Sequence, residues 1–93
     1  MKEGNPSENA LEELAQNIRS EYWRKLGRRL DINDAKLDAF ERIEDLSEKV
    51  YQMLLHWKAK EGSKATFQVL NDALCHHLVQ NRDVAETFCC NQF

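Results

Sequence analysis

Residues that could bind a metal ion are gathered in the C-terminal part of the sequence. They are Cys75, His76, His77, Cys89 and Cys90, and thiolates and imidazoles are the ligands that zinc prefers. Their spacing suits one ion poorly, because adjacent cysteines cannot easily both bind it and consecutive residues spread around a helix. No basic or apolar run flanks the last two cysteines, so lipid attachment is not favoured either. We predict no metal site, and we interpret these cysteines as one buried thiol and two oxidisable tail cysteines.

The sequence contains no pattern that is typical of catalysis. It has no glycine-rich phosphate loop, no serine or cysteine nucleophile motif and no pair of carboxylates in a recognisable frame. Acidic residues occur along much of the chain, so their presence alone indicates no active site. We therefore predict a protein that is not an enzyme and needs no cofactor.

Charged residues are segregated in one part of the chain. Residues 18–30 hold five basic residues and one acid, whereas residues 31–48 hold seven acids and two basic residues. Surfaces of opposite charge can pair with copies or relatives of the same protein, and a basic helix beside an acidic one favours heterologous pairing. The candidate partner-binding residues are Arg24, Lys25, Arg28 and Arg29 on the basic side, and Asp34, Asp38, Glu41 and Glu44 on the acidic side. The alternative is that both groups form solvated faces with weak local salt bridges.

Composition and apolar spacing predict the elements that carry these charges. The 93 residues are 42% hydrophobic, with one proline and three glycines, which favours a single all-α domain. The expected helices are about Glu8–Arg19, Glu21–Leu30, Asp34–Ile43, Ser47–Lys60, one capped by Thr66 and one starting at Asn81 or Asp83. Ser7 and Asn33 are the expected N-caps of the first and third helices, and Gly62 is the expected stop of the fourth. The predicted core residues are Leu14, Ile18, Trp23, Leu26, Leu30, Leu37, Phe40, Val50, Leu54, Trp57, Leu70 and Leu74.

Three classes of protein are disfavoured by the same observations. The N-terminus is polar and unlike a signal peptide, and no apolar run approaches the roughly 20 residues of a membrane span. Three cysteines do not form a secreted disulfide framework, so we expect a reducing, cytoplasmic location. The net charge of −3 disfavours a general nucleic-acid binder.

Three stretches resemble the death-domain family. They are Trp23–Leu30 with Ile32 (a W-x-x-L-x-x-x-L pattern), VYQMLLHW from Val50 to Trp57 followed by Gly62, and Lys64-Ala65-Thr66 through Ala73-Leu74. Within the family the chain resembles the adaptor death domains most, with segments similar to the Fas-associated death-domain adaptor and the caspase-2 adaptor. Receptor and ankyrin death domains are only slightly less similar. The Cys89-Cys90 tail departs from the family pattern.

This resemblance implies a six-helix antiparallel Greek-key bundle. We expect residues 1–6 to form a flexible leader, 7–90 the domain and 91–93 a tail. The resemblance also implies homotypic assembly with other death-domain proteins in apoptotic or inflammatory signalling. Receptors and adaptors are the expected partners, with weak self-association and no nucleic-acid or membrane contact. In the family, contacts through helices 2 and 3 and through helices 1 and 4 recur. In the Fas-associated adaptor a basic helix 2 is part of the receptor-binding surface, and its positions are matched here by Arg24, Lys25, Arg28 and Arg29.

Two alternatives remain open. A structural death domain would keep its charges solvated and would not oligomerise in signalling. A helix-turn-helix nucleic-acid binder would use the helix that starts at Asp34 to read DNA, but the acids on that helix repel phosphate.

Overall fold

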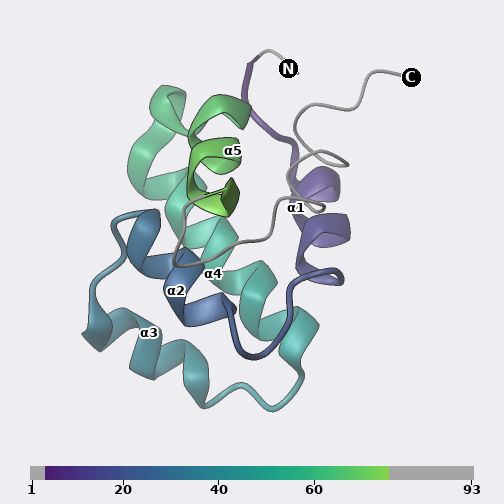
Figure 1. The fold of residues 1–93 in the computed structure, drawn as a ribbon, viewed down its shortest axis with the longest axis vertical. Coiled ribbons are helices and arrows are strands. Elements are labelled where there is room, and N and C mark those ends of the chain that lie inside the picture. The colour runs from purple at the N-terminus through teal and green to yellow at the C-terminus, as the bar shows by residue number, and fades with distance from the viewer. Residues whose placement is uncertain (1–3, 76–93) are drawn as a thin grey trace.

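The computed structural model describes residues 4–75, and within that range the chain is all-helical (Figure 1). The elements are α1 (Glu8–Ala15), α2 (Trp23–Arg29), α3 (Asp34–Glu41), α4 (Leu46–Glu61), a 3₁₀ turn η1 (Gly62–Lys64) and α5 (Phe67–Cys75). The predicted all-α class is confirmed for these residues. The sixth helix expected from Asn81 or Asp83 lies outside the described residues, so the six-helix Greek-key arrangement stays a prediction.

Side-chain caps determine where three helices begin. Ser7 Oγ accepts a hydrogen bond from the amide of Ala10 at 3.2 Å, and Asn33 Oδ1 accepts one from Lys36 at 2.9 Å. The Thr66 hydroxyl caps α5 in the same way by accepting from the amide of Val69 at 3.2 Å. Each bond satisfies one of the backbone donors that a helix start leaves unpaired, and all three caps were predicted.

The start of α4 differs from the prediction. Its N-cap is Asp45, whose Oδ2 accepts from the amide of Glu48 at 2.8 Å, so the helix begins at Leu46 rather than near Ser47. The Asp45 carboxylate accepts this hydrogen bond and also places a negative charge at the positive end of the helix, and both effects stabilise the helix start.

The first helix is shorter than predicted, and the second begins later. The amides of Asn17 and Ile18 bond to carbonyls three residues back, and the Asn17 side chain donates to the Glu13 carbonyl at 2.9 Å. These contacts close α1 at Ala15 instead of Arg19, because they satisfy carbonyls at its end without continuing the helix. The second helix then begins at Trp23, two residues later than expected.

A compact turn ends α2 and directs the chain into α3. The amide of Ile32 donates to Gly27 O at 3.0 Å and that of Asp31 to Arg28 O at 3.1 Å, which is the bonding pattern of a Schellman motif. Asp31 adopts the left-handed conformation at φ 67°, where glycine is the usual residue. The turn buries Ile32, which is 3% exposed.

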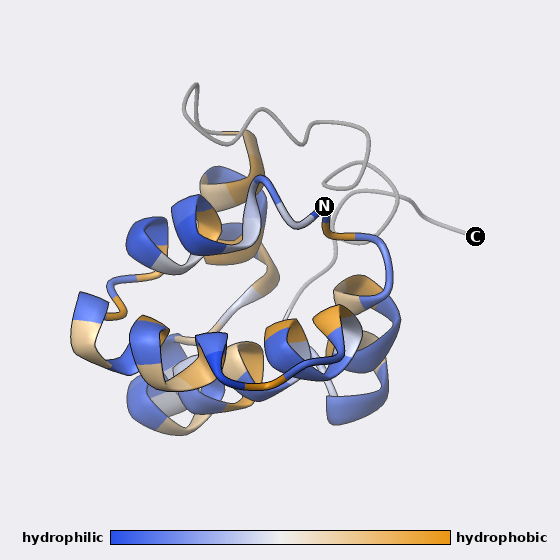
Figure 2. Cartoon of the chain, turned by 90° about the horizontal axis from the view of Figure 1, so that it is seen from below, coloured by the Kyte–Doolittle hydropathy of each residue, from blue (hydrophilic) through white to orange (hydrophobic). Residues whose placement is uncertain are grey.

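The core forms around α4, which contacts α1, α2 and α3 (Figure 1). Apolar and hydrophilic residues alternate along the helices, as expected for amphipathic helices around one core (Figure 2). Eleven of the twelve residues assigned to the core from the sequence are buried. The core also contains Leu11, Ala15, Ile32, Met53, Ala65 and Ala73. Phe40 is the exception: it is half-buried, because it lies on the outer helix α3 and packs against the core from its edge.

Gly27 marks a close approach of α2 to its neighbours in the core. A Cβ atom at this position would lie 2.6 Å from Leu37 Cδ2 and 2.9 Å from Met53 Sδ. Both distances are below van der Waals contact, so the missing side chain allows α2 to approach α3 and α4 closely.

The segment before α1 is attached to the turn before α5. Asn5 Nδ2 donates to the carbonyls of Ser63 at 3.1 Å and Ala65 at 2.6 Å, and the amide of Phe67 donates to Gly4 O at 3.1 Å. Pro6 is buried. Residues 4–6 of the predicted leader are therefore held against the bundle.

Candidate partner-binding surface

The guanidinium of Arg24 binds the acidic helix α3 with both of its terminal nitrogens. Nη2 donates to Asp38 Oδ1 at 2.8 Å, and Nη1 lies 3.7 Å from Glu41 Oε1. The side chain is only 27% exposed. The hydrogen bond with Asp38 raises the pKa of Arg24, burial partly opposes it, and the charges of the neighbouring acids raise it further. Arg24 thus holds α2 and α3 together.

A lysine from α4 extends this ion-pair network to a third helix. Lys49 Nζ donates to Glu41 Oε2 at 2.8 Å, and its side chain is 13% exposed. The same ammonium lies 5.3 Å from the centre of the Trp23 ring, while the Arg24 guanidinium lies 5.7 Å from it. Both distances fit cation–π contacts, so the buried indole shares the two cations with the acids of α3.

One turn later on α2, Arg28 makes a single contact with α3. Its Nε donates to Asp34 Oδ1 at 3.2 Å, and the two side chains are 51% and 68% exposed. The pair borders an open surface hollow of about 460 Å³ where α2 ends and α3 begins. The lining residues are Arg28, Arg29, Asp31, Ile32, Asn33 and Asp34.

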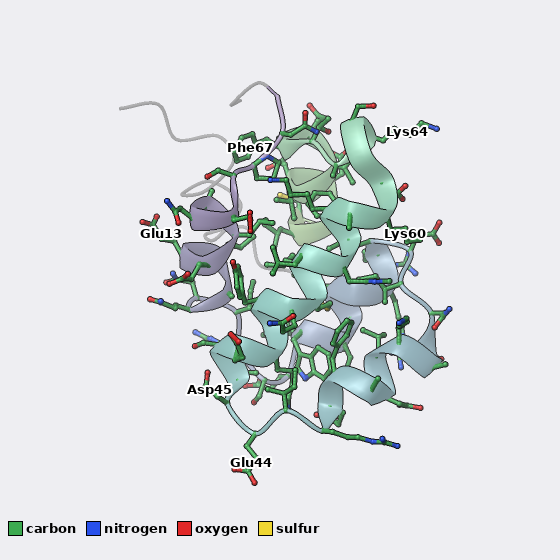
Figure 3. The ribbon with its side chains drawn as sticks, turned by 180° about the vertical axis from the view of Figure 1, so that it is seen from behind. Glu13, Glu44, Asp45, Lys60, Lys64 and Phe67 are labelled. Carbon is green, nitrogen blue, oxygen red and sulfur yellow. The ribbon has the colours of Figure 1, made fainter. Side chains whose placement is uncertain are left out.

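The other three candidates from the sequence are exposed. Lys25 extends over the ring of Tyr22, 5.7 Å from its centre, and Arg29 lies at the end of α2 beside the hollow. Glu44 is labelled in Figure 3, on the loop between α3 and α4. Because α3 ends at Glu41, Glu44 lies beyond the helix that carries the other three acidic candidates.

Part of this charge is paired within the chain. Arg24 and Arg28 form ion pairs with α3 of the same molecule, as the alternative of local salt bridges anticipated. Binding of a partner by these residues stays a prediction. The α2–α3 surface is partly neutralised, and its cations are not equivalent.

A second charged surface, on α1 and α4, was not identified from the sequence. Burial raises the pKa of the half-buried Tyr51 on α4, and the nearby carboxylates of Glu8, Glu12 and Glu48 raise it further. The three acids are exposed and come from two helices separated by thirty or more residues. The i, i+4 spacing of Glu8 and Glu12 could have indicated an acidic face on α1. Only the packing of α1 on α4 brings Glu48 close to these two residues.

A histidine on α4 contributes a titratable group beside α3. The His56 ring packs against Phe40 with 5.9 Å between ring centres. Burial lowers the pKa of His56, and the positive charges of Lys36 and Lys60 lower it further. The neutral imidazole is therefore the form that suits this contact.

No group of three metal-ligating side chains occurs within residues 4–75. Cys75 is half-buried at the end of α5, and its Sγ lies 3.8 Å from Asn71 Oδ1. The other metal-ligand candidates, His76, His77, Cys89 and Cys90, lie outside the described residues. In the part of the chain that the structure describes, no helix is long and apolar enough to cross a membrane.

Comparison with known families agrees with this arrangement of helices. A sequence model of the death-domain family matches residues 8–88, which include all five described α-helices. A search of curated proteins gives no significant match. The family match covers most of the sequence and joins the three stretches that carry the resemblance. The chain therefore belongs to the death-domain family, whose members are protein-interaction modules and not enzymes.

Proposed function

We propose that this domain assembles with other death domains in apoptotic or inflammatory signalling, and that it also associates weakly with itself. The proposed setting is the cytoplasm, in an adaptor or a receptor tail, because an odd number of cysteines is not typical of a secreted disulfide framework. The proposal rests on family membership and on the two charged surfaces of the described residues.

The observation that supports assembly is that the two surfaces are opposite in charge and lie apart. The exposed cations Lys25, Arg28 and Arg29 lie on α2, whereas the exposed acids Glu8, Glu12 and Glu48 lie on α1 and α4, near Tyr51. The ribbon views place α4 between α1 and α2, so one molecule cannot join these two surfaces (Figures 1 and 3). A contact between them is heterologous, and repeated heterologous contacts build rings or helical assemblies instead of two-fold dimers.

A charge-swap experiment tests this contact. Variant one carries Arg28→Glu and Arg29→Glu, and variant two carries Glu8→Lys and Glu12→Lys. Each variant presents two surfaces of the same sign, so we expect each alone to sediment as a monomer at low salt. Mixed in equal amounts, the two should associate again, because opposite charges then face each other. Sedimentation velocity at low and physiological salt provides the measurement.

Arg24 is left unchanged in both variants, because its ion pairs hold α3. Circular dichroism must show that the helical content and Tm of both variants match those of the original chain. Association that survives both reversals would contradict the proposed surfaces. A chain that stays monomeric at every concentration and salt, and captures no other death-domain protein, would favour the structural alternative.

A further inference from the structure

We propose that residues 4–6 form a strap that sets the conformation of the turn between α4 and α5. Release of this strap opens the turn and the start of α5, while the core around α4 stays folded. The strap is thus a conformational device through which the segment before α1 controls a turn 58–60 residues further along the chain. None of its residues belongs to the two charged surfaces, so strap release does not depend on the proposed assembly.

The side chain of Asn5 holds the turn at two points. Its Nδ2 atom donates to the carbonyls of Ser63 at 3.1 Å and Ala65 at 2.6 Å. A carboxamide nitrogen carries two hydrogens, so these two bonds use its full donor capacity. The two carbonyls flank Lys64, and a single planar group that binds both of them fixes the spacing across the 3₁₀ turn η1.

The backbone of the strap completes the start of α5. The amide of Phe67 donates to Gly4 O at 3.1 Å. The amide of Val69 donates to the Thr66 hydroxyl at 3.2 Å. Amides in the first turn of a helix have no partner within that helix. The strap and the N-cap therefore each satisfy one of the donors that α5 leaves unpaired, and Figure 3 shows Phe67 beside the segment that leads into α1.

The sequence of the strap suits this role. Gly4 adopts φ 82°, a conformation that glycine reaches without the steric cost that other residues meet. Asn5 precedes a proline, and a residue in that position is restricted to extended conformations. Pro6 is buried, and Ser7 directly after it caps α1. The strap is therefore anchored at α1 on one side and at α5 on the other, and it has little backbone entropy to lose on docking.

The turn depends on the strap because it has little support of its own. Of residues 62–66 only Ala65 is buried. Within the turn, the amide of Ala65 donates to Gly62 O at 3.1 Å and that of Thr66 to Lys64 O at 2.9 Å. A segment with few buried apolar contacts and with exposed hydrogen bonds opens at low cost. The bonds from the strap are therefore a large part of what holds this turn.

The opening is confined to one end of the bundle. Asn5 is exposed, so the strap is accessible from solvent. Its release breaks two side-chain bonds and one backbone bond and exposes Pro6. The later α5 residues Leu70, Ala73 and Leu74 are buried in the core and stay in place. Cleavage of the segment before α1, or its capture by another protein, is thereby transmitted to the turn.

The test is amide hydrogen exchange followed by NMR in Asn5→Asp, with Asn9→Asp as the matched control. The ionised aspartate has no donor and places a negative charge against two carbonyl oxygens. Asn9 is exposed in the first turn of α1, so the control makes the same chemical change away from the turn. We expect Asn5→Asp to accelerate exchange of the Ala65 and Phe67 amides about 10-fold or more, and to leave Leu54 on α4 unchanged. The control should accelerate none of them.

A second variant tests the backbone contact without changing Asn5. Gly4→Ala strains the positive φ, and nothing lies within 4 Å of the added Cβ, so the substitution introduces no clash. The cost of a left-handed conformation predicts an acceleration of about 5- to 30-fold at Phe67, again without a change at Leu54. Circular dichroism checks that all three variants retain the helical content of the original chain.

Any of three results would overturn the proposal. Unchanged exchange at Phe67 in both strap variants would show that the turn does not depend on the strap. Equal acceleration at Phe67 and Leu54 would show that the strap and the core open together in global unfolding. Equal acceleration in Asn9→Asp would assign the effect to the added charge. The charge-swap experiment reports on assembly separately, so failure of the strap leaves the proposed function standing, and the reverse also holds.

Discussion

The helices α3 and α4 are neighbours that are held in place by different forces. On α4, Val50, Met53, Leu54 and Trp57 are all buried, and the helix contacts three others. On α3 only Leu37 is buried, while Asp34, Asp38 and Glu41 form ion pairs with α2 and α4. Burial of apolar surface is strong and insensitive to salt, whereas half-exposed ion pairs are weak and screened by salt. The outer helix is therefore the more adjustable element.

This difference has a consequence for the surface that we propose for assembly. The hollow is formed where α2 ends and α3 begins, so its shape depends on the attachment of the adjustable helix. Polar attachment leaves α3 dependent on ionic conditions, and the core around α4 does not share that dependence. The following predictions test this division, from the largest expected effect to the smallest.

Truncation of a core leucine on each helix compares the two attachments directly. We expect Leu54→Ala to lower the free energy of unfolding by about 3–5 kcal/mol, because α4 is surrounded and cannot collapse into the cavity. We expect Leu37→Ala to cost about 2–3 kcal/mol, because the outer helix can move inward and fill part of the space. Urea denaturation with a shared m-value measures both, and equal costs would contradict the proposed mobility of α3.

Adding a methyl group at the close approach tests how tightly α2 fits against both helices. Gly27→Ala places its Cβ too near Leu37 and Met53. Overpacking of this kind costs about 1–3 kcal/mol, and the better helix propensity of alanine returns up to about 1 kcal/mol. We expect net destabilisation in urea denaturation. In a Leu37→Ala background the same substitution should cost less, because only the close approach to Met53 then remains.

Hydrogen exchange can show whether α3 opens independently of the core. We expect the amides of α3 to exchange faster than those of the middle of α4, because fewer apolar contacts must break. Raising the salt from low to about 1 M should accelerate exchange on α3 by a small factor, since the Debye length shortens to about 3 Å. Mass spectrometry of peptides from the two helices gives both rates, and identical protection would refute the comparison.

The smallest effect concerns pH at the contact between α3 and α4. The pKa of His56 is lowered from its ordinary value of 6.5, so the folded protein binds this proton less readily than the unfolded chain does. The histidine therefore contributes stability that is fully present above pH 6.5 and is lost as the pH falls below that value through the lowered pKa. Tm measured from pH 7.5 to pH 5 should decline more in the original chain than in His56→Gln. If Tm declines equally with pH in both proteins, the protonation of His56 does not contribute to the pH dependence of stability.

Several features of the fold were predictable because their causes are local. Helical spacing of apolar residues identified all five described α-helices, and Ser7, Asn33 and Thr66 cap where their side chains suggested. The errors are also local in origin. Competing short-range bonds end α1 early, and the Asp45 cap starts α4 one residue earlier than predicted.

The candidate surface was predictable only as a set of residue types. The sequence by itself determined a helical domain of the death-domain pattern with segregated charges, because spacing and composition act along the chain. Only the tertiary structure decided that Arg24 faces Asp38 and Glu41, that Arg28 pairs with Asp34 beside a hollow, and that Glu48 lies near the acids of α1. The physical reason is that charge pairing depends on distances of a few ångströms between helices, and packing of the core around α4 sets those distances.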